Sequence, residues 1–327
     1  MTDWNELIFD DEVDFSAKLE NVFTYQYREN KVYRRFCDAL SYSFDPDTEP
    51  PLLPIRAFKD AVVTCKPDKK PDLVFQSSGT SGMDRSRHLV ADETLYRQSL
   101  LRGFRQFYEL DRSVIWAYTP GYSDNPVSSL IWMLHELIEQ EQSGLSRFLP
   151  LGEPLDRADI SQVEKTGKQL ILFGAAFGLL DLLDMGAPQL PGNSIVIETG
   201  GMKTHRREIG KEELHRRLAA GFGLDQSRVH SEYGMCELLS QAYTTGGQWF
   251  KTVPWMKVSI RNPDDPRSEM PPFQEGLIGV IDLANVHSCS FLLTGDKGIR
   301  HKDGRFKIHG RWNPKDLRGC NFLIDED

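Results

Sequence analysis

A short run rich in serine, threonine and glycine carries the clearest chemical signal in the sequence. Residues 72–76 predict a strand, and the six residues that follow it are Ser77, Ser78, Gly79, Thr80, Ser81 and Gly82. Two glycines let the backbone turn tightly and approach an anion, while hydroxyl and N–H groups can bind phosphate oxygens. The GxxxxGK[ST] spacing of a Walker loop is absent, which disfavours an ordinary P-loop NTPase. We interpret Ser77–Gly82 as a phosphate-binding loop; the alternative is a flexible Ser/Gly loop.

A second segment, residues 231–237, brings an aromatic ring, a glycine and a carboxylate together. Tyr233 offers a flat face for a base, and Gly234 permits close approach of a ligand to the backbone. Glu237 supplies a hard oxygen ligand of the kind that suits Mg²⁺. Taken alone, the same residues are typical of a helix start with a core tyrosine.

Two further segments near the C-terminus could bind a sugar or a phosphate. In the first, Thr294-Gly295-Asp296, we expect a strand to end in a turn that presents one carboxylate to ribose hydroxyls. In the second, a strand over residues 305–309 ends at Gly310-Arg311, so that Arg311 can reach ribose or phosphate. The alternatives are an ordinary Asx turn and a solvated strand edge.

The elements that position these segments alternate between strand and helix. Apolar runs predict strands at 114–118, 170–173 and 194–198, and periodic patterns predict helices at 128–141, 175–185 and 211–220. This alternation predicts an α/β fold with mainly parallel sheets flanked by helices. After residue 249, short strands at 257–260, 277–283, 290–294 and 305–309 predict a smaller antiparallel layer.

Length, charge and cysteine usage exclude several classes of protein. The 327 residues suffice for about two domains or one large one, and the net charge of −9 gives no basic footprint for nucleic acid. No run of about 18 apolar residues predicts a membrane span. The acidic N-terminus lacks an apolar signal core, and the five cysteines form no CxxC pair. We therefore expect a cytoplasmic protein without a disulfide scaffold or structural zinc.

The order and spacing of the four chemical segments resemble the core of the adenylate-forming superfamily, which includes acyl-CoA synthetases, luciferases and peptide-synthetase adenylation domains. A fifth segment, Glu198-Thr199-Gly200-Gly201-Met202-Lys203, resembles the loop that lines adenine there. The closer resemblance is to the acyl-protein synthetases, the long-chain-fatty-acid–luciferin-component ligases. Residues 231–235 look like that branch's version of the loop, and Arg318-Gly319-Cys320-Asn321 looks like its acyl-accepting segment. The resemblance covers roughly residues 70–327.

This resemblance implies the N-terminal core of an adenylate-forming enzyme, with the superfamily's mobile C-terminal domain missing. We expect a helical lead-in at residues 1–50, an adenylate-forming core at 51–311, and a C-terminal stub at 312–327 that carries the acyl-accepting cysteine.

The resemblance also implies a reaction in two halves. A carboxylic acid, expected to be a fatty acid, attacks ATP to give an acyl-adenylate, and a thiolate then takes the acyl group. Cys320 would hold the thioester and pass it to an acceptor protein such as an acyl reductase, with Lys315 close by. The implied cofactors are ATP and Mg²⁺, with Glu237 on the metal. The implied nucleotide-binding residues are Ser77–Gly82, Gly200, Gly201, Tyr233, Gly234, Cys236, Asp296 and Arg311.

Three departures from the superfamily pattern matter. Cys236 stands where a threonine is usual, so it is either a second nucleophile or a tolerated replacement. The phosphate loop lacks the usual Pro-Lys ending. The adenylation lysine of the missing domain has no counterpart; the lysines that could replace it are Lys297, Lys302, Lys307 and Lys315, of which we name Lys315 for its closeness to Cys320.

Two other functions fit the same segments. A ligase of the phenylacetate–coenzyme A type would release acyl-CoA without need of Cys320. A non-enzymatic adenylate-binding protein would bind nucleotide and release no pyrophosphate. Exchange of pyrophosphate into ATP in the presence of acids separates the enzymes from the binding protein.

Overall fold

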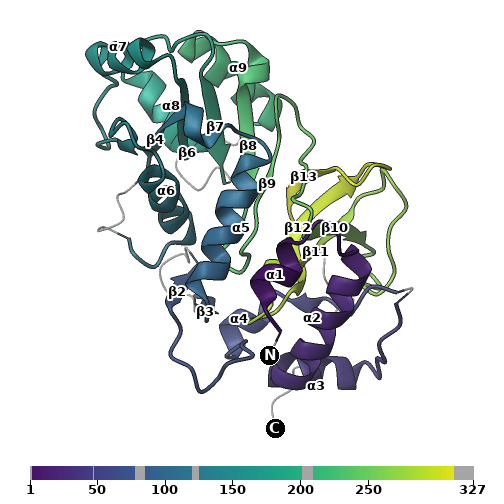
Figure 1. Ribbon diagram of the computed structural model, residues 1–327. Coiled ribbons are helices and arrows are strands. Elements are labelled where there is room, and N and C mark those ends of the chain that lie inside the picture. The colour runs from purple at the N-terminus through teal and green to yellow at the C-terminus, as the bar shows by residue number, and fades with distance from the viewer. Residues whose placement is uncertain (1, 47, 78–84, 120–124, 201–208, 313–327) are drawn as a thin grey trace. The chain divides into compact units, whose positions relative to one another are not determined.

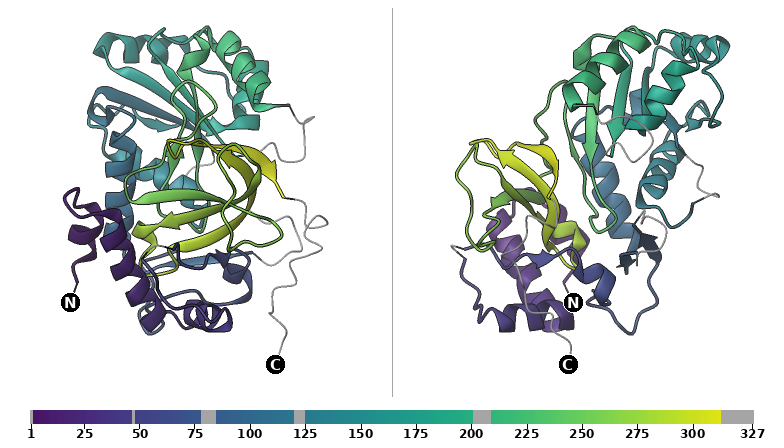
Figure 2. Two further views of the ribbon diagram at one scale, coloured as in Figure 1. Left: turned by 90° about the vertical axis from the view of Figure 1, so that its right-hand side faces the viewer. Right: turned by 180° about the vertical axis from the view of Figure 1, so that it is seen from behind.

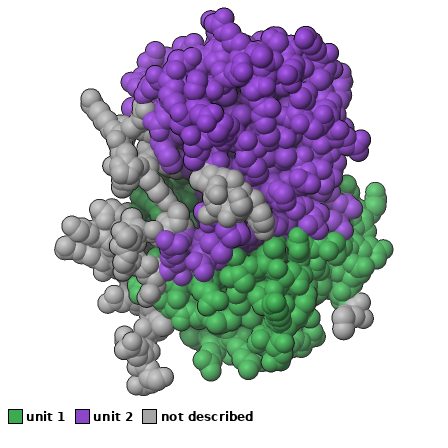
Figure 3. Space-filling view, turned by 90° about the vertical axis from the view of Figure 1, so that its left-hand side faces the viewer, with its two compact units in different colours: residues 1–74, 86–95, 254–327 green, residues 75–85, 96–253 purple. Residues whose placement is uncertain are grey.

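The computed structural model describes residues 2–46, 48–77, 85–119, 125–200 and 209–312. The chain forms two compact units (Figure 3). Unit 1 comprises residues 1–74, 86–95 and 254–327, and unit 2 comprises residues 75–85 and 96–253. Because each unit collects segments that are distant in the sequence, no single linker separates them. The division at residues 50 and 311 stays a prediction.

Unit 2 is built on a six-stranded sheet in the order β5-β4-β6-β7-β8-β9, whose central strands lie side by side in Figures 1 and 2. The strands are β4 (Ser113–Tyr118), β5 (Arg147–Phe148), β6 (Gln169–Ala175), β7 (Ile195–Thr199), β8 (Val229–Tyr233) and β9 (Ala242–Tyr243). Neighbouring strands from β5 to β8 are parallel, and β9 is antiparallel to β8. Every residue of β4 and β7 is buried, as expected for a parallel sheet with both faces covered.

Helices follow the strands of unit 2 as the alternating pattern predicts. They are α6 (Ser129–Glu139), α7 (Arg157–Thr166), α8 (Ala176–Asp184) and α9 (Lys211–Phe222), with one-turn helices η1 (Leu110–Arg112) and η2 (Gln226–Arg228). Apolar residues of α7, α8 and α9, among them Val163, Leu179 and Leu218, share one core cluster with Trp116 and Leu172 of the sheet. The predicted mainly parallel sheet with flanking helices is confirmed.

Unit 1 contains the antiparallel layer predicted for the C-terminal part of the chain. Its five strands are β1 (Leu53–Pro54), β10 (Met256–Arg261), β11 (Gly276–Asp282), β12 (Phe291–Arg300) and β13 (Phe306–Arg311). They run in the order β1-β12-β11-β10, with β13 also paired to β12. Only the β1–β12 pairing is parallel among these strands. A one-turn helix, η3 (Leu283–Asn285), follows β11.

Three N-terminal helices belong to the core of unit 1: α1 (Trp4–Phe9), α2 (Phe15–Glu29) and α3 (Lys31–Ala39). The Tyr33 ring stacks on Phe291 of β12 with 5.3 Å between centroids. Gln26, which is fully buried, donates from Nε2 to the carbonyl oxygens of Asn285 and Val286. These contacts satisfy the buried polar groups of the turn after β11, so the helices hold that end of the sheet.

Three short elements complete the description. They are α4 (Ala57–Asp60), β2 (Leu73–Gln76) and β3 (Arg87–Val90), and β2 pairs with β3. α5 (Glu93–Arg105) follows, with Asp92 accepting a hydrogen bond from the Leu95 amide. In the part of the chain that the structure describes, each helix is too short or too polar to cross a bilayer.

Candidate active site

The carboxyl ends of β7 and β8 form the edge of the unit 2 sheet at which most of the predicted adenine-binding residues lie. β7 ends at Thr199 and is followed by Gly200, whose positive φ of 77° favours glycine. β8 ends at Tyr233 and is followed by Gly234. Thr199 and Glu232 are register partners, so the two loops leave the sheet side by side. Ligands of open parallel sheets commonly bind at such an edge.

The residues after β8 form a turn, so the alternative of a helix start is wrong. Residues 236–237 are in a turn, and the Leu238 amide donates to the Met235 carbonyl oxygen over 3.1 Å. Cys236 is partly exposed, whereas Glu237 is buried. Tyr233 is also buried, and its ring centroid lies 6.0 Å from that of Phe250.

The predicted ribose-binding residues lie together in unit 1, on a different local structure from the one expected. Asp296 lies inside β12 rather than in a turn after a strand, because β12 continues to Arg300 and pairs with β13. Asp296 and Arg311 are register partners on these two strands, with Arg311 Nε 3.6 Å from Asp296 Oδ1. The Arg311 side chain is 83% exposed, which leaves its guanidinium accessible to a ligand.

Several predicted residues fall outside the described part of the chain. They are Ser78, Gly79, Thr80, Ser81, Gly82, Gly201, Lys315 and Cys320. Ser77, the first residue of the phosphate loop, directly follows β2 and is partly buried. Among the other lysines considered, Lys297 lies on β12 and pairs with Glu275 at 3.4 Å, and Lys307 lies on β13.

A buried polar cluster near this edge of the sheet was not predicted from the sequence. Glu198 of β7 lies 3.3 Å from His215 Nε2 and 3.4 Å from Lys211 Nζ, and it accepts a hydrogen bond from the Ser231 hydroxyl. Burial alone would raise the pKa of Glu198, but the His215 and Ser231 hydrogen bonds and the Lys211 charge bring it below its ordinary value. Lys211 Nζ also lies 4.3 Å from the Phe250 ring centroid.

The next strand carries a second buried carboxyl group with the opposite behaviour. Burial and the negative charge of Glu198 raise the pKa of Glu232 to about 7, although the Thr199 hydroxyl and Lys211 oppose that shift. The second-last residues of two adjacent strands are thus one glutamate whose pKa is lowered and one whose pKa is raised to about 7. One feature of the sequence could have indicated this cluster: an acidic residue near the end of an apolar run that predicts a buried parallel strand. Because such strands rarely bury an unpaired charge, the acidic residue needs a buried partner.

The chain is similar to a known protein family and to a curated protein. The family model described as "Acyl-protein synthetase, LuxE" matches residues 156–327, just over half of the chain. The long-chain-fatty-acid–luciferin-component ligase of Vibrio harveyi is 22% identical over 95% of this chain and 87% of its own.

Solved structures share the fold. A 2-hydroxyisobutyryl-CoA ligase in its thioesterification state aligns with a TM-score of 0.64 and 14% identity over 91% of this chain and 67% of its own. ATP-bound MatB of Rhodopseudomonas palustris aligns with a TM-score of 0.53 and 16% identity over 74% of this chain and 48% of its own. The luciferase-like enzyme of the Zophobas morio mealworm aligns with a TM-score of 0.51 and 19% identity over 84% and 63%.

These likenesses confirm the predicted α/β core. The family match confirms the predicted enzyme class, an ATP-dependent acid ligase that forms AMP. The chain belongs to the acyl-protein synthetase family LuxE.

Proposed function

We propose that the protein is an acyl-protein synthetase that activates a fatty acid as its adenylate, takes the acyl group onto Cys320 as a thioester, and passes it to an acceptor protein such as an acyl reductase. The observation that carries this proposal is the family match over residues 156–327, which includes Tyr233, Asp296 and Cys320. The name of the Vibrio harveyi relative supports a long-chain fatty acid as the substrate class and a protein component as the acceptor.

The described geometry supports roles for the nucleotide-binding residues. The loops after β7 and β8 leave one sheet edge, which supports adenine binding by Gly200, Gly201, Tyr233, Gly234 and Cys236. Asp296 and Arg311 form one pair, which supports a joint role in binding the nucleotide. The carboxylate would accept hydrogen bonds from ribose hydroxyls, and the guanidinium would donate to ribose or phosphate. Ser77–Gly82 would bind the phosphates through hydroxyl and amide groups.

The chemistry of the residues fits a magnesium ion that is bound mainly through the nucleotide. Mg²⁺ usually keeps one or two protein carboxylates and takes its other ligands from phosphates and water. No group of three metal-ligating side chains occurs within the described ranges, and Glu237 supplies one buried carboxylate. Glu237 would therefore hold the ion, which neutralises phosphate charge when it is bound.

Each half-reaction exchanges one bond for another. A carboxylate oxygen of the acid bonds to the α-phosphorus of ATP, and the bond from that phosphorus to the bridging oxygen breaks to release pyrophosphate. The Cys320 thiolate then bonds to the acyl carbon, and the bond to AMP breaks. Both steps depend on positioning and charge neutralisation. The nearby cations Lys315 and Arg318 would lower the pKa of the thiol and so favour the thiolate.

Intact-mass spectrometry tests the whole proposal. The protein is incubated with ATP, Mg²⁺ and one carboxylic acid at a time, from aryl to long-chain fatty acids. We expect a mass increase of one acyl group with a fatty acid, and its removal by hydroxylamine. If AMP forms only after coenzyme A is added and no adduct appears, the protein is a CoA ligase instead.

Two matched cysteine variants assign the acceptor. We expect Cys320→Ser to release pyrophosphate but to form no hydroxylamine-sensitive adduct, while Cys236→Ser keeps the adduct. An adduct that persists in Cys320→Ser and disappears in Cys236→Ser would move the thioester to Cys236.

A further inference from the structure

We propose that Glu232 is a positioning residue for nucleotide binding, which holds the carboxyl end of β7 against that of β8 through its hydrogen bond to Thr199. This inference rests on the proposed function of the same sheet edge. Glu232 itself faces away from the nucleotide side of β8, because side chains alternate along a strand and Tyr233 is its neighbour.

The hydrogen bond joins the last residue of β7 to the second-last residue of β8. Thr199 Oγ1 and Glu232 Oε2 are hydrogen-bonded, and both residues are buried. Thr199 is the last residue before Gly200, and Glu232 is the last before Tyr233. This side-chain bond adds to the backbone pairing of the two strands at the points from which both loops leave the sheet.

The lack of space for a side chain at Gly234 independently supports a positioning role for Glu232. A Cβ atom added at Gly234 would lie 2.4 Å from Glu232 Oε1, well inside van der Waals contact. The Glu232 carboxyl group thus fills the space beneath the loop after β8. Because any side chain at position 234 would displace that carboxyl group, Gly234 and Glu232 constrain the loop together.

The groups around Glu232 make its ionised form costly. Glu198 is the register partner of Ser231, so its side chain lies on the opposite face of the sheet from that of Glu232 and acts on Glu232 through its charge. Lys211 of α9 also acts through its charge, and Tyr243 is the register partner of Glu232 on β9. The negative charge of Glu232 also contributes to the raised pKa of Tyr108, after burial. Lys211 is already paired with Glu198, at 3.4 Å.

The hydrogen bond that the Thr199 hydroxyl donates favours the ionised form of Glu232, but burial and the charge of Glu198 outweigh it. The pKa of Glu232 is raised to about 7 by burial and then by Glu198, so the neutral form is lost as the pH rises through that value. Ionisation adds the negative charge of Glu232 to that of Glu198 near the sheet edge where ATP would bind. ATP affinity should then fall above neutral pH, and glutamine at position 232 should remove that fall.

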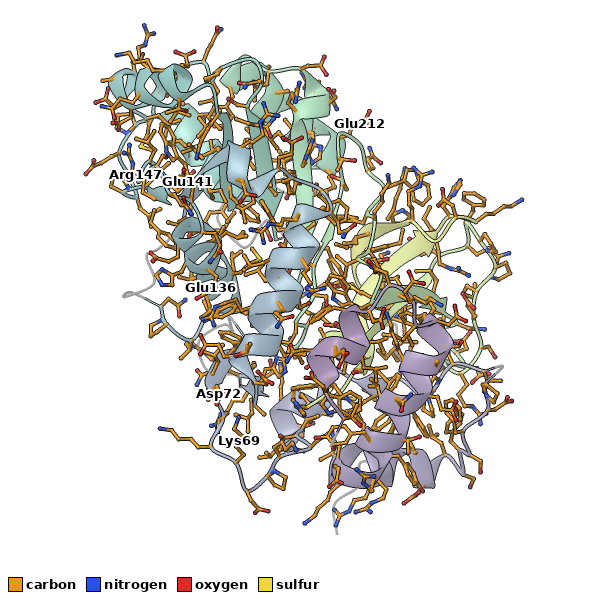
Figure 4. All side chains as sticks on the ribbon, viewed as in Figure 1. Lys69, Asp72, Glu136, Glu141, Arg147 and Glu212 are labelled. Carbon is orange, nitrogen blue, oxygen red and sulfur yellow. The ribbon has the colours of Figure 1, made fainter. Side chains whose placement is uncertain are left out.

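Equilibrium binding of ATP, measured calorimetrically from pH 6 to pH 8.5 without any acid substrate, tests this role. The variants are Glu232→Gln, Glu232→Ala and the control Glu212→Gln, which changes an exposed carboxylate on α9 (Figure 4). The titration of ATP's own phosphates is common to all four proteins, so their differences report on the side chain. Circular dichroism checks that each variant is folded.

We expect Glu232→Gln to bind ATP within about twofold of wild type at pH 6 and to lose the extra weakening at high pH. Glu232→Ala should bind about tenfold more weakly than wild type at pH 6, since a buried hydrogen bond is lost, and it should also lose the extra weakening at high pH. Glu212→Gln should follow wild type. A Glu232→Gln profile that matches wild type across the whole range overturns the inference, even if Glu232→Ala fails to fold. Failure of the wild type itself to bind ATP would instead refute the proposed function, and this inference with it.

Discussion

Asp296 and Arg311 face each other across two paired strands, with Arg311 Nε 3.6 Å from Asp296 Oδ1. The carboxylate is largely covered, at 14% exposure, whereas the guanidinium is open to solvent. A pair whose arginine is open to solvent contributes little to stability, because water and salt screen it. Its geometry is better suited to binding, since the covered carboxylate fixes the position of an arginine that remains available to a ligand.

The first prediction follows from this pair. Asp296→Asn and Arg311→Ala should each raise the KM for ATP by about tenfold or more, since each removes a hydrogen bond with a charged partner. Thermal stability should change little. ATP–pyrophosphate exchange at varied ATP measures the effect.

A neighbouring pair on the same hairpin provides the control. Arg305 donates to Asp303 at 2.8 Å, and Asp303 is exposed, so Asp303→Asn removes a comparable surface interaction. We expect its KM for ATP to remain that of wild type. Equal KM values for Asp296→Asn and wild type would remove Asp296 from the nucleotide site.

The sequence predicted the sheet of unit 2 well, because its strands are continuous apolar runs between helical patterns. It placed Asp296 wrongly, since a Gly-Asp dipeptide usually marks a turn. In the folded chain, pairing with β13 extends β12 through that dipeptide to Arg300. The local preference for a turn was overridden by strand pairing, which depends on contacts that no short window contains.

In the candidate site, too, some features could be predicted from the sequence and others could not. Spacing and residue type located Tyr233, Gly234 and Glu237, and family resemblance supplied their roles. The interaction between Glu198 and Glu232 could not be predicted, because it depends on the order of β7 and β8 in the sheet and on the placement of α9. Burial and charge partners, which give the two carboxyl groups opposite pKa shifts, exist only in the folded chain.

The second prediction concerns thiol reactivity. Burial raises the pKa of Cys37 to about 12, and it also raises the pKa values of Cys65 and Cys289. All three are buried, whereas Cys236 is partly exposed at the proposed adenine loop. Iodoacetamide at neutral pH should therefore modify Cys236 in the native protein and leave the three buried thiols intact, since alkylation requires an accessible thiolate.

Bound nucleotide should protect this thiol. Peptide mass spectrometry after brief alkylation should show several-fold slower modification of Cys236 when ATP and Mg²⁺ are present. The same experiment with GTP controls for general effects of a nucleotide. Identical alkylation rates with and without ATP would place Cys236 outside the nucleotide site.

The third prediction concerns acid stability. Glu141 (Figure 4) accepts hydrogen bonds from Lys168 Nζ at 2.5 Å and from the Ser143 hydroxyl at 2.7 Å. Burial alone would raise its pKa, but these hydrogen bonds lower it to about 2. Because the folded-state pKa is depressed, the stability that Glu141 contributes is complete above its ordinary pKa and is lost as the pH falls from about 4.5 to about 2.

Urea denaturation at two pH values checks this. Glu141→Gln should lower the free energy of unfolding by about 1–3 kcal/mol at pH 7, and by much less near pH 2, where protonation has removed most of the stability that the wild-type carboxylate contributes. Glu139→Gln, which changes an exposed carboxylate on α6, should have little effect at either pH. A loss for Glu141→Gln that is equally large at both pH values would show that packing, rather than the charge, makes the contribution.

The fourth prediction concerns the metal. Glu237 is buried in the turn after β8, and we propose that it binds Mg²⁺ beside the nucleotide. Glu237→Gln keeps the shape of the side chain but removes the negative charge, so it should raise the Mg²⁺ concentration for half-maximal pyrophosphate exchange by about tenfold. High Mg²⁺ should restore part of the rate, because the ion keeps its phosphate ligands. Glu275→Gln, which changes an exposed carboxylate in unit 1, serves as the control and should leave the Mg²⁺ requirement unchanged. If Glu237→Gln has a lowered rate that no Mg²⁺ concentration improves, the carboxylate supports the turn and does not bind the metal.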